Sequence, residues 1–552
     1  MMSHPYLRFR SLNLRVPGCL VFGWLCFPVL AAIGQARAPG ELSWAIRSDP
    51  RTLDSAQVDD QSSELLRYLT GGVLLRINRQ TQQPEPSLAA SWSISSDGKI
   101  VLFRLRSDLH FSDGSSLTAK DVAWSLRRVL LPATAAPVAA EFLAPAGVHV
   151  DILDPATVRV SLSKRVVGIA SVFDEIAIEP AGRASDGKVS AGPFMLGDHK
   201  PGQYIHLVRN PHYWRHDSSG GALPYAAGIR LDIVSNREQE VLRFSRGEYD
   251  LIDNLPGEYF PILANRITGS ARDLGPSLNT EQMWFNLAPS APLPAYEKDW
   301  FQNTAFRLAV SQAIHRNDLV RIAYQGHATP AHGFISPANS LWTNKILRFP
   351  PENVAEAIQR LSSAGFRRSG AHLFDSSGHA VKFSLMTNAG NVARGHMATL
   401  IQADLAKLGI EVSIVTLDFP ALIERMMHSQ DYEACLLGLT NVNPDPNAMM
   451  NEWLSSSPNH QWNPSEKVPA TPWEAEIDTE MLKQASSLRM EDRKRAVDRV
   501  QQIVADQQPF IYLVHPNALY AVSPLLEGVS PSVFQPGLVW NVDVLRRKAS
   551  TK

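Results

Sequence analysis

The sequence predicts a mixed α/β protein with more than one folded lobe. Its 552 residues are too many for a single hydrophobic core, because cores stop growing at roughly 250–300 residues. Segments with apolar residues at helical spacing alternate along the chain with short runs that are typical of strands. No short repeat is evident, so a solenoid or propeller is not expected.

Capping residues and apolar spacing place the clearest elements. Thr118 can cap a helix over 118–130, because Asp121 stands three residues later, as in a capping box. Apolar residues at helical spacing predict further helices near 354–361, 397–408 and 496–504. Gly409 can supply the left-handed turn that ends the helix at 397–408. Alternation over 410–414, and the apolar run 510–514 after a proline, predict strands.

Three stretches are expected to lie outside helices and strands. Residues 217–221 are rich in Gly and Ser and predict a surface loop. Prolines in 289–294 disfavour strand pairing and indicate a hinge or linker. The polar stretch 455–472 lacks periodicity, so we expect a long loop there, either functional or a mobile surface insertion.

The N-terminus has the pattern of a secretory signal peptide. Arginines precede an apolar stretch at 16–34, small residues follow it, and we place the signal at residues 1–38. Cleavage fits Ala36-Arg37-Ala38 or, because Pro39 disfavours that cut, Ala32-Ile33-Gly34. Prolines and glycines interrupt the apolar stretch, which disfavours the alternative of a membrane anchor. We therefore expect a periplasmic protein.

Charge and cysteine content narrow the function classes. The formal net charge is −1, so no overall field attracts nucleic acid or an anionic membrane. Two of the three cysteines lie in the signal, which leaves Cys435 alone and unable to form an internal disulfide. It stands in the apolar run 434–437, so we expect a buried core residue and not a nucleophile. No later stretch resembles a membrane span, so in transport other chains would form the pore.

Common catalytic and metal-binding motifs are absent from the sequence. It contains no nucleophile elbow, no HExxH and no phosphate-binding loop. His206, His212 and His216 lie close together, but their spacings of six and four do not match a zinc pattern. We therefore predict no enzyme, no cofactor and no metal site.

Ordered motifs cover the chain from Pro86 onward. The longest series is PSLAASW at 86–92, SDGK at 96–99, FRLR at 103–106, FSDG at 111–114 and LTAKDVAWSL at 117–126. Later motifs are AGPF at 191–194, RNPHYW at 209–214, FN at 285–286, FRLAVSQAI at 306–314 and GIEV at 409–412. In these motifs the chain resembles the family 5 solute-binding proteins of bacterial ABC importers, the oligopeptide-, dipeptide- and nickel-binding group.

The resemblance implies a two-lobed periplasmic-binding-protein fold (type II, similar to cluster C) with an extra subdomain inserted in lobe I. It implies lobe I at 39–79 and 184–282, the inserted subdomain at 80–183, lobe II at 283–504, and a return of the chain to lobe I at 505–552. The lobes would close over a solute, with a peptide expected, and an inner-membrane permease with ATPase subunits would receive it. The chain would act as a monomer and bind no nucleic acid.

Two positions depart from the peptide binders of this family, in which an Asp pairs with the ligand's amino group and an Arg with its carboxylate. Here Val442 stands in place of the Asp, and Asn388 in place of the dipeptide binder's Arg. An unpaired ammonium in a closed cleft is costly, so the standard dipeptide mode is not expected. Asp445 or Asp60 can substitute for the missing carboxylate. No matching histidine favours the nickel-binding branch.

The candidate solute contacts are therefore polar groups from both lobes. They are Asp60, Gln61 and Ser62 from lobe I, and Asn388, Thr440, Asn441, Asn443 and Asp445 from lobe II. Trp284 and Trp462 are expected as apolar or stacking walls. Each of these residues has a structural alternative, because Asn favours turns and caps and large aromatics usually fill cores.

Two other classes of function stay open. One is a ligand sensor or periplasmic chaperone that uses the same scaffold without transport. The other is a hydrolase, which needs a Ser or Cys beside a base. The sequence shows no such pairing.

Overall fold

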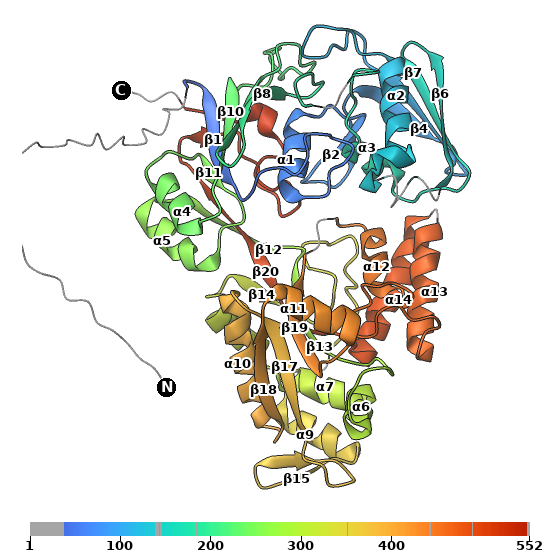
Figure 1. Cartoon of the computed structure of the whole chain (residues 1–552), viewed down its shortest axis with the longest axis vertical. Coiled ribbons are helices and arrows are strands. Elements are labelled where there is room, and N and C mark those ends of the chain that lie inside the picture. The colour runs from blue at the N-terminus through green and yellow to red at the C-terminus, as the bar shows by residue number, and fades with distance from the viewer. Residues whose placement is uncertain are drawn as a thin grey trace, which may run out of the picture. The chain divides into compact units, whose positions relative to one another are not determined.

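The computed structural model describes residues 38–138, 143, 146–183, 186–349, 351–440, 443–487 and 489–548 (Figure 1). The expected signal peptide lies outside these residues except for Ala38. No helix within the described ranges is long and apolar enough to cross a membrane.

Four strands form the central sheet of the first lobe. They are β1 (Glu41–Ile46), β10 (Gly228–Ile233), β9 (Tyr204–Arg209) and β8 (Phe194–Lys200), in that spatial order. β1 runs parallel to β10, and the other pairs are antiparallel. Apolar side chains of this sheet share a core with α1 (Gln61–Thr70) and with residues after position 519. The end of the chain therefore packs with its beginning.

A second sheet folds between α1 and β8 in the sequence. Its antiparallel strands are β4 (Ala89–Ile94), β5 (Ile100–Leu105), β7 (Thr157–Leu162) and β6 (Val148–Asp154), in that spatial order. The helices α2 (Ala119–Val129) and α3 (Ile169–Glu175) complete a hydrophobic core of its own. The predicted capping box is confirmed, because Thr118 Oγ1 accepts from Lys120 N–H and Asp121 accepts from Thr118 N–H. We call this unit the inserted subdomain.

An eight-stranded sheet forms the centre of the second lobe and reaches the first. Its main path is β11 (Leu251–Ile252), β20 (Ile511–Val522), β13 (Thr280–Phe285), β19 (Ala434–Leu439), β17 (Lys382–Asn388) and β18 (Glu411–Leu417), and β12 (Ala271–Pro276) and β14 (Ala328–Pro330) pair with β20. β13 is antiparallel to β19 and β20, and β17 is parallel to β18 and β19.

The long strand β20 belongs to both lobes, as Figure 1 shows. Residues 511–516 pair with β13 and β14, whereas residues 517–522 pair with β12 and β11. The chain also crosses in the turn 277–279, between β12 and β13. The pairing thus places the return to the first lobe within β20, later than the boundary at 505 expected from the sequence.

The expected hinge at 289–294 is corrected by the structure. This stretch lies between β13 and α6 (Ala295–Gln302), both of which belong to the second lobe. Prolines do keep it out of the sheet, as predicted. Its position inside one lobe means that it does not connect the two lobes.

The remaining predicted elements in the second lobe are confirmed. They correspond to α9 (Val354–Ser363), α10 (Val392–Ala406), α14 (Met490–Gln507), β18 and β20. Gly409 has a φ of +86° after α10, as its predicted role requires. The other helices are α4 (Arg237–Ser245), α5 (Phe260–Arg266), α7 (Thr304–Ala313), α8 (Arg316–Asp318), α11 (Phe419–Glu424), α12 (Met450–Trp453), α13 (Pro472–Ser486), η1 (Pro132–Thr134), η4 (Gly257–Tyr259), η5 (Leu319–Ala323), η6 (Arg425–Ser429), η7 (Pro446–Met449) and η8 (Val542–Val544). Short strand pairs are β2 (Leu75–Ile77) with β3 (Pro84–Pro86), β15 (Arg367–Ser369) with β16 (His372–Phe374), and β21 (Leu526–Glu527) with β22 (Arg546–Arg547).

The predicted long loop lies between α12 and α13. Its central side chains, at 460–463, are buried. The loop therefore packs into the second lobe, which excludes the alternative of a mobile surface insertion.

Candidate functional site

The chain crosses between the two lobes at residues 277–279 and again within β20, and both crossings lie at the same edge of the second-lobe sheet. β13 starts there with Thr280, which pairs with Leu439 at the end of β19. β17 runs parallel to β19, so its last residue, Asn388, lies at that edge too. β20 departs beyond Val514, which pairs with Glu281. This crossing edge, formed by the ends of β17, β18 and β19 and the start of β13, therefore faces the first lobe. Ligands commonly bind at the carboxyl ends of parallel strands.

A buried ion pair lies at the crossing edge. Arg394, in the first turn of α10, donates to Glu281 of β13 with Nε–Oε2 at 2.7 Å and Nη2–Oε1 at 3.1 Å. Their side chains are 14% and 7% exposed. Burial alone would lower the pKa of Arg394, but the Glu281 carboxylate raises it, so the guanidinium stays charged. Gly438 makes room for the pair, because a Cβ there would lie 2.7 Å from Glu281 Oε1.

The same arginine orients the candidate residue Asn388. Arg394 Nη1 donates to Asn388 Oδ1 at 2.8 Å. A guanidinium only donates, so this contact identifies the oxygen of the Asn388 amide. The Nδ2 group, which makes a 3.2 Å bond to the Ala389 carbonyl, is left as a directed donor. Thr440 is exposed directly after β19, at the same edge.

Tyr324, which follows η5, adds a hydroxyl to this cluster. Burial and the nearby Glu281 carboxylate raise its pKa well above 10, so the phenol stays neutral. The crossing edge thus combines a neutralised charge pair with neutral hydrogen-bonding groups.

Asn443 and Asp445 lie where the second lobe contacts the inserted subdomain. Asn443 Oδ1 accepts from Asp445 N–H at 2.9 Å. Asp445 accepts two bonds from Arg493 of α14, with Nη1–Oδ2 at 2.9 Å and Nη2–Oδ1 at 2.5 Å. Two residues later, Asn447 Nδ2 donates to the Val167 carbonyl of the subdomain at 3.4 Å. The guanidinium occupies the Asp445 carboxylate, which speaks against its expected role as the partner of a ligand ammonium.

In the first lobe, the three expected contacts form the start of α1. Asp60 Oδ1 caps the helix by accepting from the N–H groups of Ser62 at 3.0 Å and Ser63 at 3.1 Å. Burial would raise the pKa of Asp60, but bonds from Ser63 and from backbone N–H groups lower it. Gln61 is exposed and Ser62 is buried. Among the described residues, no hydrogen bond or ion pair joins these three to the second lobe.

Trp284 and Trp462 lie in the hydrophobic core, and both are 0% exposed. Trp284 Nε1 donates to Tyr432 Oη at 3.1 Å, and Trp462 Nε1 donates to Glu474 Oε1 at 2.8 Å. Their expected place as cleft walls is corrected, because both rings are covered on all sides and both indole N–H groups are already bonded. We leave them out of the proposed contact set.

The structure brings together Asn388 and Thr440 and places Asn443 and Asp445 at a contact between lobes. Asn441 lies outside the described residues. Sequence reasoning missed Arg394, Glu281 and Tyr324. Arg394 stands six positions after the Asn that replaces the expected Arg. A search of the following helix for a displaced guanidinium would have found it.

Cys435 offers no nucleophile at the crossing edge. It is 0% exposed in β19, as predicted, and burial raises the pKa of its thiol. A protonated thiol in the core is a packing residue and not a reactive one.

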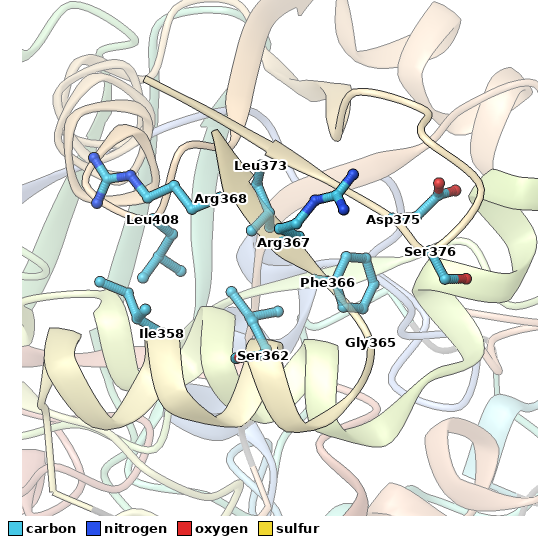
Figure 2. A pocket seen from close by; sticks show the side chains of 11 residues that line it. Ile358, Ser362, Gly365, Phe366, Arg367, Arg368, Leu373, Asp375, Ser376 and Leu408 are labelled. Carbon is cyan, nitrogen blue, oxygen red and sulfur yellow. The ribbon is translucent and has the colours of Figure 1, made fainter. Parts of the chain in front are cut away.

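A separate pocket of about 530 Å³ lies between α9 and the hairpin β15–β16. Figure 2 shows Phe366, Leu373 and Leu408 among its apolar lining, with Arg367, Arg368 and Asp375 around them. Leu408 precedes β18, so the pocket lies toward the edge of the sheet opposite to the crossing edge. It is therefore not the candidate solute site.

Comparison with known proteins agrees with this architecture. Residues 83–461 match the family described as bacterial extracellular solute-binding proteins, family 5 Middle. A probable ABC transporter-binding protein of Deinococcus radiodurans is 25% identical, with 90% of each chain covered. The probable D,D-dipeptide-binding periplasmic protein DdpA of Escherichia coli K12 is 24% identical, with 91% of this chain and 93% of that protein covered.

A solved structure shows the same fold. NikA from Brucella suis, in complex with Fe(III)-EDTA, superposes with a TM-score of 0.77 at 18% identity and covers 92% of this chain and 100% of its own. This likeness supports the two-lobed type II binding-protein fold expected from the sequence. Because the family match spans more than half of its length, this chain belongs to family 5 of the bacterial extracellular solute-binding proteins.

Proposed function

We propose that this chain binds a peptide or a similar small polar solute between its lobes and delivers it to an ABC permease of the inner membrane. One observation carries the proposal. Both crossings leave the sheet at an edge where Asn388 and Thr440 are accessible. The names of the Deinococcus and Escherichia relatives support an ABC transporter and a peptide solute.

The charge balance of the crossing edge suggests how the solute is recognised. Arg394 and Glu281 neutralise each other, and Asp445 is bound to Arg493. A buried charge without a partner is costly, so the pairs are expected to persist when a solute binds. Neutral groups then do the recognition. Asn388 donates to a carbonyl or carboxylate oxygen, while Thr440, Asn443 and the start of α1 supply further hydrogen bonds.

We propose that catalysis plays no part in this function and that the chain works outside the cytoplasm. The relatives are named as binding proteins, one of them periplasmic. The signal expected at residues 1–38 would direct export. The intact mass of the mature protein after periplasmic expression would locate the cut. Nothing in the described residues favours the sensor or chaperone alternative.

The first test identifies the solute. Mature protein from periplasmic expression is denatured, and the released molecules are analysed by mass spectrometry. A series of peptides with varied side chains is expected. A single non-peptide species would overturn the peptide assignment but leave solute binding intact. Turnover of a bound peptide would overturn the non-enzymatic role.

The second test uses Asn388→Asp with the identified solute and isothermal titration. The carboxylate can still face Arg394 but has no N–H to donate, so we expect the solute affinity to fall by about tenfold or more. Asn265→Asp, the same change on the exposed face of α5, is the control and should leave affinity unchanged. Equal affinity in both variants would remove Asn388 from the proposed site.

A further inference from the structure

Three ligand-type side chains meet inside the second lobe, in and after the loop between α12 and α13. His460 Nε2 lies 3.4 Å from Glu466 Oε1 and 3.8 Å from Glu474 Oε1. The three atoms all lie within 4.8 Å of one another. The side chains are buried, with 1%, 4% and 2% of their surface exposed.

Neighbouring groups fix the orientation of each side chain. His460 Nδ1 is 3.1 Å from the Glu452 carbonyl, which only accepts, so Nδ1 carries a proton. Glu474 accepts from Trp462 Nε1 at 2.8 Å and from the Thr471 hydroxyl at 2.7 Å. A metal-binding histidine commonly donates its second ring nitrogen to a carbonyl in this way.

One atom of His460 and one of Glu466 remain without a hydrogen-bond partner in the described part of the chain, and they lie next to each other. Glu466 Oε2 accepts from Ala470 N–H at 2.6 Å. Its other oxygen, Oε1, and His460 Nε2 are buried and have no hydrogen-bond partner among the described residues. A neutral imidazole with a proton on Nδ1 turns a lone pair toward these carboxylates. That arrangement is repulsive unless a metal ion between the three atoms, or a proton on Nε2, supplies a positive charge.

We propose that His460, Glu466 and Glu474 bind one divalent transition-metal ion of the zinc class. Zinc bonds to nitrogen and oxygen of about 2.0–2.2 Å put neighbouring ligand atoms of a tetrahedron roughly 3.3–3.6 Å apart. The observed 3.4 Å matches this range and the 3.8 Å lies just outside it. Two carboxylates and a neutral imidazole also balance the charge of the ion.

A protonated His460 is the competing arrangement. An imidazolium N–H would bond to a carboxylate at about 2.7–2.9 Å, shorter than either observed distance. Metal binding and this ion pair differ in a measurable way, because metal must displace the proton from Nε2.

The expected absence of metal rested on the spacing of His206, His212 and His216. The three ligands proposed here are separated by six and eight residues, and the fold of the loop brings them together. Leu287 N–H donates to the Trp462 carbonyl at 2.9 Å, just beyond the end of β13. The ion would therefore anchor the loop at the edge opposite to the crossing edge.

The test uses the mature protein without an affinity tag, stripped with a chelator and titrated with Zn²⁺ or Co²⁺ alone. We expect about one ion per chain by mass spectrometry of the metal, and the intense visible absorption of four-coordinate cobalt. Titration in buffers of different ionisation enthalpy should show release of about one proton. Co²⁺ should also quench the fluorescence of Trp462, whose ring centroid is 3.9 Å from that of His460.

Glu466→Gln should weaken zinc binding by about tenfold or more. Glu476→Gln, an exposed carboxylate on α13, should bind zinc like the wild type. Zinc at about a hundredfold excess over its Kd should raise the Tm of the wild type by roughly 3–5 °C. If Glu466→Gln does not fold, the number of metal ions bound per wild-type chain and the cobalt absorption spectrum decide whether the site exists. No bound ion in the wild type, or equal binding by both variants, would overturn the site and leave the ion pair.

Discussion

The two edges of the second-lobe sheet differ in whether their buried charges are paired with opposite charges. At the crossing edge, Arg394 and Glu281 neutralise each other through two short bonds. At the opposite edge, where β13 ends and β19 begins, like charges gather. Glu433 precedes β19 there, and together with burial it raises the pKa of Glu297 to about 7. We call this second edge the far edge.

The difference indicates which kind of ligand or ion each edge can bind. The crossing edge is electrically balanced by its own residues, so a solute can bind there through neutral donors and acceptors without leaving a charge unpaired. At the far edge, Glu297 lies close to Glu433, and Glu466 and Glu474 face one imidazole. Excess carboxylate of this kind takes up protons or cations. The proposed solute site and the proposed metal site thus lie at opposite ends of the same strands.

The strongest way to break the balance is Arg394→Met. This change leaves Glu281 buried without its partner, so we expect a loss of about 3–5 kcal/mol in the free energy of unfolding, measured by urea denaturation. Arg499→Met is the control, because its partner Glu476 is exposed and such pairs contribute under about 1 kcal/mol. Adding Glu281→Gln to Arg394→Met should recover much of the loss. Equal small losses in both single variants would contradict a buried pair.

A second prediction concerns pH at the crossing edge. Burial lowers the pKa of His515, in β20, from 6.5 to about 4. The unfolded chain therefore takes up the proton first as pH falls, so stability present above pH 6.5 is lost between about 6.5 and 4. His515→Asn removes this dependence. We expect the stability difference between wild type and variant to shrink by about 3 kcal/mol from pH 7 to pH 4.

Urea denaturation at a series of pH values measures this difference. His396→Asn, the same change at an exposed position of α10, serves as control and should run parallel to the wild type. A constant difference between wild type and His515→Asn across this range would show that His515 is not buried in the neutral form.

Local signals in the sequence were enough to predict helix boundaries and the family to which the chain belongs. Thr118 with Asp121 fixes the start of α2, and Gly409 marks the turn before β18, because caps and left-handed turns depend on a few adjacent residues. The ordered motifs from Pro86 onward likewise predicted the family that the comparison confirms.

Contacts between distant segments could not be predicted in the same way. Prolines at 289–294 suggested a hinge, but strand register, a property of pairing between segments, places the crossings at 277–279 and within β20. Trp284 and Trp462 look like ligand walls in sequence, yet tertiary packing buries them. Arg394 was missed because its role depends on Glu281, 113 residues earlier.

The last prediction tests the far edge with Glu297→Gln. The pKa of Glu297 is raised from 4.5 to about 7 by burial and by Glu433. The folded chain therefore holds this proton more tightly than the unfolded chain, and the stability it contributes below pH 4.5 is lost as pH rises through about 7. A neutral glutamine escapes that loss. The variant should gain about 1–2 kcal/mol over the wild type between pH 4.5 and 8, because solvent at the half-buried Glu433 screens part of the repulsion. Glu424→Gln, the same change at an exposed position of α11, should show no such gain. As pH rises, the Glu297→Gln variant should become more stable relative to the wild type, whereas the His515→Asn variant should become less stable relative to it. If Glu297→Gln instead lost stability relative to the wild type with rising pH, the carboxylate of Glu297 would be balanced by a positive charge, which contradicts an excess of carboxylate at the far edge.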